Sequence, residues 1–214
     1  MYPANIAMPA QPSPSRLEAF SDGVIAVIIT IMVLELKVPR EAGMAGFVTT
    51  LPALAVYAQS FAFTGIYWVN HHHLVARLRR VDHLILWTNL IFLFCLSLLP
   101  FFTNYLVEKR MDSFSVALYA VSLLTTGVGF TLLQKAIGRH LCRYKTKDDA
   151  YERRLQMAEQ RKAYLSLTMY LAATPLAFWR PWVALADVAL VTVIWIIPTF
   201  GLRPEQAQEP LETE

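Results

Sequence analysis

The chain has 214 residues, of which 56% are hydrophobic and only 16% are charged, and its formal net charge is +3. This apolar share is unusual for a soluble domain, and long apolar runs predict an all-α integral membrane protein whose main surroundings are a lipid bilayer. The long loop 138–163 contains both basic and acidic residues. This mixture argues against a nucleic-acid partner and fits an anchor on the cytoplasmic side.

The first fifteen residues, MYPANIAMPAQPSPS, are rich in proline and lack the basic region of a signal peptide. We expect residues 1–15 to form a disordered cytoplasmic tail. Ser15 and Glu18 have the spacing of a capping box, which predicts that the first helix begins at Arg16.

The first predicted span, Phe20–Val38, contains an acidic residue, Asp22. A carboxylate inside a membrane is costly and is a functional-site hypothesis by default. At about 100° per residue, Asp22 lies roughly 140° from Val27, so the acid and the apolar side of the helix face different neighbours. That apolar side comprises Phe20, Gly23, Val27, Thr30, Ile31 and Leu34.

The apolar side of this helix has two interpretations. Ordinary packing against other helices is one. In the other, Val27, Thr30 and Leu34 line a pore on a symmetry axis, where apolar rings gate by dewetting and hydroxyls help to coordinate a partly dehydrated ion. The second interpretation requires an oligomer, because one chain supplies one such helix. Periodicity alone does not choose between them.

Five further spans follow the first, each approaching the length of about 20 residues that a bilayer requires. The fifth is short and contains Pro175, and Pro100 and Pro198 lie near the ends of the third and sixth. Residues 16–202 are thus expected to form one six-helix domain, and 203–214 a disordered acidic tail. Cys95 and Cys142 are not expected to form a disulfide or a metal site. The five spans are Phe47–Val69, Leu84–Leu106, Phe114–Ile137, Tyr164–Trp179 and Trp182–Phe200.

The basic residues give the orientation. With the N-terminus in the cytoplasm, 14 of the 19 lysines and arginines fall in inside segments. The outside loops hold the other five: Lys37, Arg40, Lys109, Arg110 and Arg180. This bias predicts that both termini are cytoplasmic.

Several polar residues fall at the same cytoplasmic depth and are expected to form an interhelical network that fixes the first helix. They are Arg16, Ser21 and Asp22 of the first span with Trp68, His71 and Asp82 of the next hairpin. No metal site is expected in the run His71–His73, because adjacent side chains on a helix point about 100° apart. Gln59 and Asp187 are expected to make interhelical hydrogen bonds.

The motif Arg16-x-x-x-Phe20-Ser21-Asp22, with the following GVIAVIIT and Leu34-Glu35-Leu36, resembles the signature of the transmembrane protein 175 family. Its members are potassium-permeable channels of bacterial membranes and animal lysosomes. The resemblance extends through WVNHH at 68–72, WTNL at 87–90 and LPF at 99–101. It covers Arg16 to about Phe102, and the later spans only by number and length.

The resemblance implies a homotetramer in the bacterial inner membrane, with the first helix of each chain lining a central pore and no carbonyl selectivity loop. The constriction and gate then map to Val27, Ile31 and Leu34, the hydroxyl layer to Thr30, and the outer mouth to Glu35. Phe20 belongs to the structural motif. The family's constriction is usually Ile or Leu, and Val27 is shorter. Potassium is the expected permeant, modestly preferred over sodium, with other monovalent cations or protons as further permeants and with no cofactor.

Two other classes of function compete with a channel. A proton- or ion-coupled transporter would use Asp22, His71 and Asp187. An intramembrane enzyme would need a motif such as HExxH or GxSxG, and the sequence contains neither. A Walker A loop is also absent. We therefore expect a protein that is not an enzyme.

Overall fold

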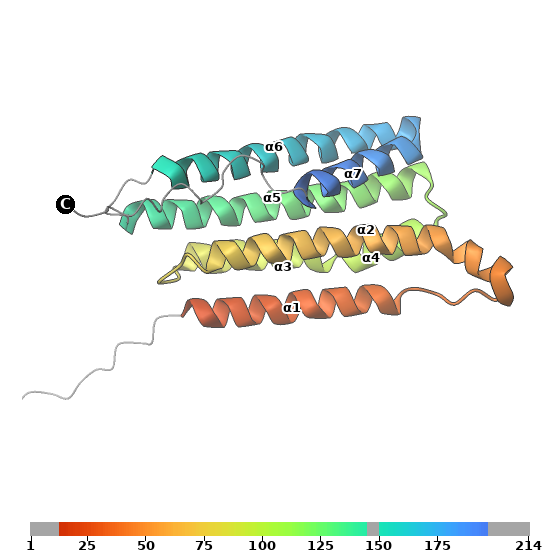
Figure 1. Ribbon diagram of the computed structural model, residues 1–214, viewed down its shortest axis with the longest axis horizontal. Coiled ribbons are helices and arrows are strands. Elements are labelled where there is room, and N and C mark those ends of the chain that lie inside the picture. The colour runs from red at the N-terminus through yellow and green to blue at the C-terminus, as the bar shows by residue number, and fades with distance from the viewer. Residues whose placement is uncertain (1–12, 145–149, 197–214) are drawn as a thin grey trace, which may run out of the picture.

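The computed structural model describes residues 13–144 and 150–196, all of whose regular elements are α-helices (Figure 1). Most of the expected N-terminal tail, the whole C-terminal tail and the end of the sixth span at Phe200 lie outside these residues, as does the side chain of Cys142. The helices are α1 (Pro14–Leu34), α2 (Gly43–Val75), α3 (His83–Ser97), α4 (Leu99–Glu108), α5 (Ser113–Tyr144), α6 (Ala150–Trp179) and α7 (Pro181–Ile196).

The first helix begins two residues earlier than the capping-box spacing predicts. Ser13 is the N-cap and Pro14 occupies the first turn, where its fixed φ suits a helix and its missing N–H costs nothing. Ser15 therefore lies inside the helix, and its hydroxyl pairs with that of Ser13 at 3.0 Å. The prediction of a capping box was wrong because it ignored this proline.

The third predicted span is a helix interrupted once. α3 ends at Ser97 and α4 begins at Leu99, with Pro100 in the first turn of α4. Proline has no N–H to donate to the carbonyl four residues earlier, and its ring crowds that carbonyl, so the α-helical pattern breaks beside it. The two helices together cover His83–Glu108, 26 residues that are apolar enough to cross a membrane.

Four stretches of the described chain are long and apolar enough to span a membrane: α1, α2, α3 with α4, and α5. α7 is apolar but covers only 16 described residues. α6 begins with a charged half, 150–162, and becomes apolar only over 164–179. This distribution of apolar helices is that of a multi-pass membrane protein.

The helices lie side by side along one direction, with α1 at one edge of the bundle and α6 and α7 at the other (Figure 1). α1 contacts α2, α3 and α4, while α5 packs on both α3 and α6. Close approach of α5 to α3 requires Gly129, since a Cβ there would lie 3.1 Å from the Cα of Phe92. Ala173, Ala177 and Ala184 bring α6 and α7 together as fully buried small residues. α1 is thereby left with one side covered and one side open.

Candidate functional site

α1 divides into two faces. Its covered face packs against its own chain and consists of Leu17, Ser21, Ile25, Ile28 and Met32. These residues recur every three or four positions, which is the spacing of one side of an α-helix. The remaining face has no cover in a single chain: Val27 is 54% exposed and Leu34 81% exposed, whereas Ile28 is 3% exposed.

The uncovered face forms one wall of a groove of about 810 Å³. Phe20, Val27, Ile31 and Glu35 line it from α1 and its C-cap, and Ser97, Pro100, Phe101 and Asn104 line it from α3 and α4. The groove mixes polar groups with large apolar ones. An ordinary lipid-facing surface would not gather a carboxylate, a hydroxyl and an amide in this way.

Phe20, a residue of the structural motif, lies on this open face and is 53% exposed, on the apolar side of the helix where its phase places it. The helical phase explains this position, because Phe20 and Val27 are seven residues apart and therefore point to the same side.

Thr30 is exposed on the same face as Val27. Its hydroxyl donates to the Val27 carbonyl at 2.9 Å. The hydroxyl proton is therefore held within the helix, and the oxygen lone pairs remain available. A hydroxyl in this state can accept a hydrogen bond from water or coordinate a cation through its oxygen, because its proton points away from that ligand.

Three buried side chains link α1, α2 and α3. The Asn89 Nδ2 donates to the Ser21 Oγ at 3.0 Å, and its Oδ1 lies 2.8 Å from the His71 Nε2. Ser21 in turn donates to the Leu17 carbonyl at 2.8 Å. Ser21 and His71 were expected to belong to such a network, but Asn89, which joins them, was missed as a site residue. Its signal is an amide in the middle of an apolar span, where an unpaired polar group is costly.

A second set of contacts joins α1 to α2 at the surface. The Trp68 Nε1 donates to the Asp22 Oδ1 at 2.9 Å, and the His72 Nδ1 lies 3.0 Å from the Glu18 Oε1. The two acids are four residues apart, as are Trp68 and His72, so antiparallel helices bring them together in two successive pairs. Asp22 therefore points to α2, in agreement with its phase, and the open face lies elsewhere on the helix.

Asp82 takes no part in this network, contrary to expectation. It is the N-cap of α3, where its Oδ1 accepts from the Ile85 N–H at 2.9 Å. Its Oδ2 lies 3.0 Å from the His140 Nδ1 on α5. Partial burial raises the pKa of the Asp82 carboxyl, but the Ile85 N–H and the His140 ring favour its charged form more strongly, so that this pKa lies below its ordinary value.

Arg16 is exposed, and its side chain makes no hydrogen bond or ion pair with another described residue. At the other end of α1, Glu35 is the exposed C-cap. Lys37, two residues further along the chain, does not pair with Glu35 and instead forms an ion pair with Glu108 at the end of α4. Within the described residues the Glu35 carboxylate is left without an ion pair, next to the groove.

The remaining buried polar candidates lie away from α1. Gln59 confirms the expected interhelical hydrogen bond, since its Nε2 donates to the Thr192 Oγ1 at 2.5 Å. Asp187 on α7 has a buried Oδ2 without a hydrogen-bond partner among the described residues. α7 packs against α2, α5 and α6, whereas Asp22 and His71 are held by Trp68 and Asn89, so none of these contacts joins Asp187 to Asp22 or His71.

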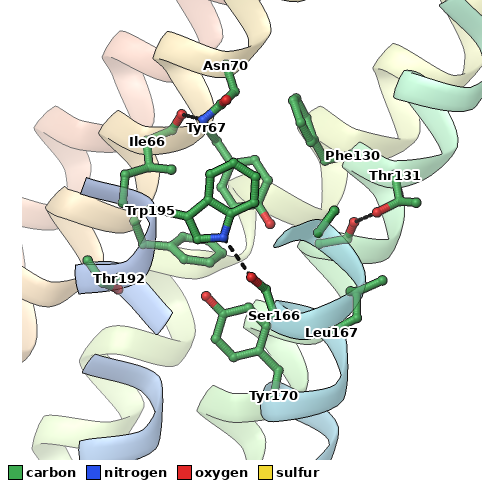
Figure 2. A pocket seen from close by; sticks show the side chains of 13 residues that line it. Ile66, Tyr67, Asn70, Phe130, Thr131, Ser166, Leu167, Tyr170, Thr192 and Trp195 are labelled. Carbon is green, nitrogen blue, oxygen red and sulfur yellow. Dashed lines mark hydrogen bonds between the residues drawn. The ribbon is translucent and has the colours of Figure 1, made fainter. Parts of the chain in front are cut away.

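A small cavity lies among α2, α5, α6 and α7 (Figure 2). Trp195 and Ser166 close one side of it, where the Trp195 Nε1 donates to the Ser166 Oγ at 2.7 Å. Tyr67 and Tyr170 also line it. Its volume of about 20 Å³ is that of roughly one water molecule, which does not provide a passage for ions. The described residues also contain no group of three or more His, Cys, Asp or Glu side chains that could hold a metal ion.

Comparison with known proteins identifies the relatives of this chain. A family model described as the endosomal/lysosomal potassium channel TMEM175 matches residues 16–100. A protein of Chryseobacterium sp. (strain P1-3), named a potassium channel, is 39% identical over 183 residues, which cover 86% of this chain and 92% of that protein. The chain belongs to the TMEM175 family.

A solved structure of a family member has the same fold. The crystal structure described as a lysosomal potassium-selective channel TMEM175 homolog from Chamaesiphon minutus superposes with a TM-score of 0.69 at 27% identity, covering 86% of this chain and 96% of that one. Mouse TMEM175, named an endosomal/lysosomal proton channel, is 35% identical over 92 residues, which are 37% of this chain and 18% of the mouse protein. These relatives are channels, and TMEM175 membership confirms that the chain is not an enzyme.

Proposed function

We propose that this chain is a passive potassium channel that works as a homotetramer in the bacterial inner membrane. Each chain crosses the bilayer six times, with α3 and α4 together forming one span and both termini in the cytoplasm. The four α1 helices meet at the axis and line the pore. The observation that carries the proposal is the open face of α1, which its own chain leaves uncovered in a family whose bacterial relatives are named potassium channels.

The pore mechanism follows from the side chains on that face. Four Val27 side chains, followed by Ile31 and Leu34, form a narrow apolar neck. Water leaves such a neck readily, and an ion that must shed its hydration shell does not enter. A small rotation or dilation of the four α1 helices wets the neck and opens it.

Thr30 supplies the only hydroxyl on this part of the face. With its proton held by the Val27 carbonyl, each Thr30 oxygen replaces part of the hydration shell of a passing cation. A ring of neutral oxygens favours the more easily dehydrated potassium over sodium, but only modestly. Glu35 at the outer mouth raises the local concentration of cations.

The coupled-transporter alternative has less support. It requires Asp22, His71 and Asp187 to act on one substrate path, and Asp187 lies on α7, which packs against α2, α5 and α6. Asp22 and His71 are each held by a neighbouring helix, through Trp68 and Asn89. This arrangement favours a fixed support for α1.

Ion flux from liposomes tests the proposal. Purified full-length chain is reconstituted into liposomes loaded with potassium, and efflux is recorded with no proton gradient, with separate liposomes loaded with sodium or with a large organic cation. We expect potassium efflux to exceed sodium efflux, with no passage of the organic cation. A pH-sensitive dye inside the liposomes reports whether protons also permeate. Absence of flux, or flux strictly tied to a counter-ion, would refute a passive channel.

A further inference from the structure

A polar cleft lies between α2, α5 and α6, away from the open face of α1. Its volume is about 330 Å³, and a second hollow that shares four of its residues extends it. The cleft is located where α2 ends and the exposed basic residues Arg77, Arg79 and Arg80 follow. Its lining is Asn70, His73, Leu74, Arg77, Gln134 and Glu159.

Two features of the cleft are unsatisfied within the described chain. The Gln134 Oε1 is buried and accepts no hydrogen bond there. Buried acceptors are nearly always paired, and an unpaired one costs about 1–3 kcal/mol, so this oxygen calls for a donor from beyond the described residues. The Arg77 Nη2 and the Glu159 Oε1 are 3.8 Å apart, which is a charge pair too long for a hydrogen bond. The donors of Arg77 therefore remain available.

The charges of the cleft select the kind of ligand. The Arg77 and Glu159 charges offset each other, so a ligand with a large net charge of either sign gains little. Arg77 and His73 offer donors that suit a phosphate. Gln134 and Glu159 offer acceptors that suit an ammonium group with its own N–H donors. A ligand that carries both a phosphodiester and a primary ammonium group matches the two sets together.

We propose that this cleft binds phosphoethanolamine chemistry, as the headgroup of phosphatidylethanolamine. The phosphate accepts from Arg77 and His73, and the ammonium group donates to Gln134 and Glu159. The basic end of a helical bundle is where headgroups lie, and basic pockets between membrane helices at that end bind the phosphates of lipid headgroups. This site does not depend on the channel function, and the proposed orientation assigns it to the cytoplasmic leaflet.

Native mass spectrometry of the full-length protein in detergent tests the site. The protein is incubated with palmitoyl-oleoyl phosphatidylethanolamine, phosphatidylcholine or phosphatidylglycerol, and bound lipid per chain is counted. We expect phosphatidylethanolamine to bind about tenfold more tightly than phosphatidylcholine, whose quaternary ammonium cannot donate to Gln134. It should also exceed phosphatidylglycerol, which lacks the ammonium group.

Variants separate the cleft from the general basic surface. Arg77→Gln removes the phosphate donor, and Gln134→Leu removes the buried acceptor at a similar size. Either should abolish the preference for phosphatidylethanolamine. Arg80→Gln is the matched control, because it makes the same charge change at an exposed arginine that does not line the cleft. It should leave the preference unchanged. Arg77 is exposed, so its variant still folds if Gln134→Leu does not.

Three results would overturn the proposal. The first is equal binding of phosphatidylethanolamine and phosphatidylcholine to the unaltered protein. The second is an unchanged preference in Arg77→Gln. In the third, soluble glycerophosphoethanolamine occupies the cleft as well as the lipid does, which would assign the site to a soluble phosphoester and not to the membrane.

Discussion

Neighbouring residues on α1 have opposite surroundings. Ile28 is 3% exposed because it packs inside its own chain, while Val27 is 54% exposed on the open face. Thr30, one turn further, keeps its oxygen lone pairs free because its proton is held by the helix backbone. At this scale the proposed pore depends on the size of one side chain, Val27, and on the polarity of another, Thr30.

We expect Val27→Ala to raise the potassium conductance of reconstituted protein by about fivefold or more. The substitution removes two methyl groups from each chain at the proposed neck. Exposing one apolar carbon to water costs about 0.8 kcal/mol, so a less apolar neck is easier to hydrate. If the barrier to ion passage falls by on the order of 1 kcal/mol, the rate of passage rises about fivefold. Single-channel recording in planar bilayers measures the effect.

The matched control is Val33→Ala. Val33 is also exposed, at 45%, but it lies about 120° from Val27 around the helix. The same substitution there should leave the conductance within about twofold of the unaltered channel, since a ratio of two is worth only about 0.4 kcal/mol. An unchanged current in Val27→Ala, or an equal rise in Val33→Ala, would remove Val27 from the pore.

Helices in this chain are joined by polar pairs at the end of the bundle where α1 begins. Asp22 with Trp68 and Glu18 with His72 connect α1 to α2, and Asn89 connects both to α3. Asp82 connects α3 to α5 through His140. These pairs hold the side of α1 that faces α2 and α3, and none of them involves its open face.

We expect Asp82→Ala to lower the free energy of unfolding by about 1 kcal/mol at pH 7, the usual cost of an N-cap. The carboxyl of Asp82 has a lowered pKa in the folded chain, so its contribution is fully present above the ordinary aspartate pKa of about 3.9 and is lost as the pH falls through the lower folded value. The difference between the two proteins should therefore shrink only below about pH 4. Denaturation monitored by circular dichroism across a pH series measures it.

Asp82→Asn is the control for the cap itself, because asparagine caps helices as well as aspartate does. It should regain most of the stability at pH 7 and lose the acid dependence. Equal stability of Asp82→Ala and the unaltered protein at pH 7 would show that the Ile85 contact is not a stabilising cap.

Four of the spans were predictable because each is a long apolar run, and this is a property of the local sequence. The ends of the helices were harder to predict from the sequence, because the start at Pro14 and the break at Leu98 depend on proline geometry at particular turns. The phase of Asp22 and Val27 was also readable, since it requires only the helical period. Pairing across helices was not, because His140 lies 58 residues from Asp82 and periodicity carries no information about tertiary neighbours.

One chain alone does not contain an ion pathway through the cavity that lies among its helices, which holds about one water molecule (Figure 2). The open side of α1 instead borders a groove of about 810 Å³ that carries Glu35, Ser97 and Asn104 among its apolar residues. Polar groups on such a surface are best accommodated by water or by a second copy of the chain. At the scale of the whole molecule, the proposed channel is therefore expected to require assembly.

Cross-linking at α1 tests which face meets the axis of the assembly. In a Cys95→Ser, Cys142→Ser background, Val27→Cys places one thiol per chain on the open face, and Ile28→Cys places it on the covered face. A short bis-maleimide should join Val27→Cys chains into covalent pairs and leave Ile28→Cys chains unlinked. Because each chain has one thiol, the denaturing gel should show pairs and nothing larger, while native mass spectrometry of the same sample should give the mass of four chains of 24.3 kDa each. Efficient pairing of Ile28→Cys, or a native mass of two chains, would contradict a four-fold pore built on the open face of α1.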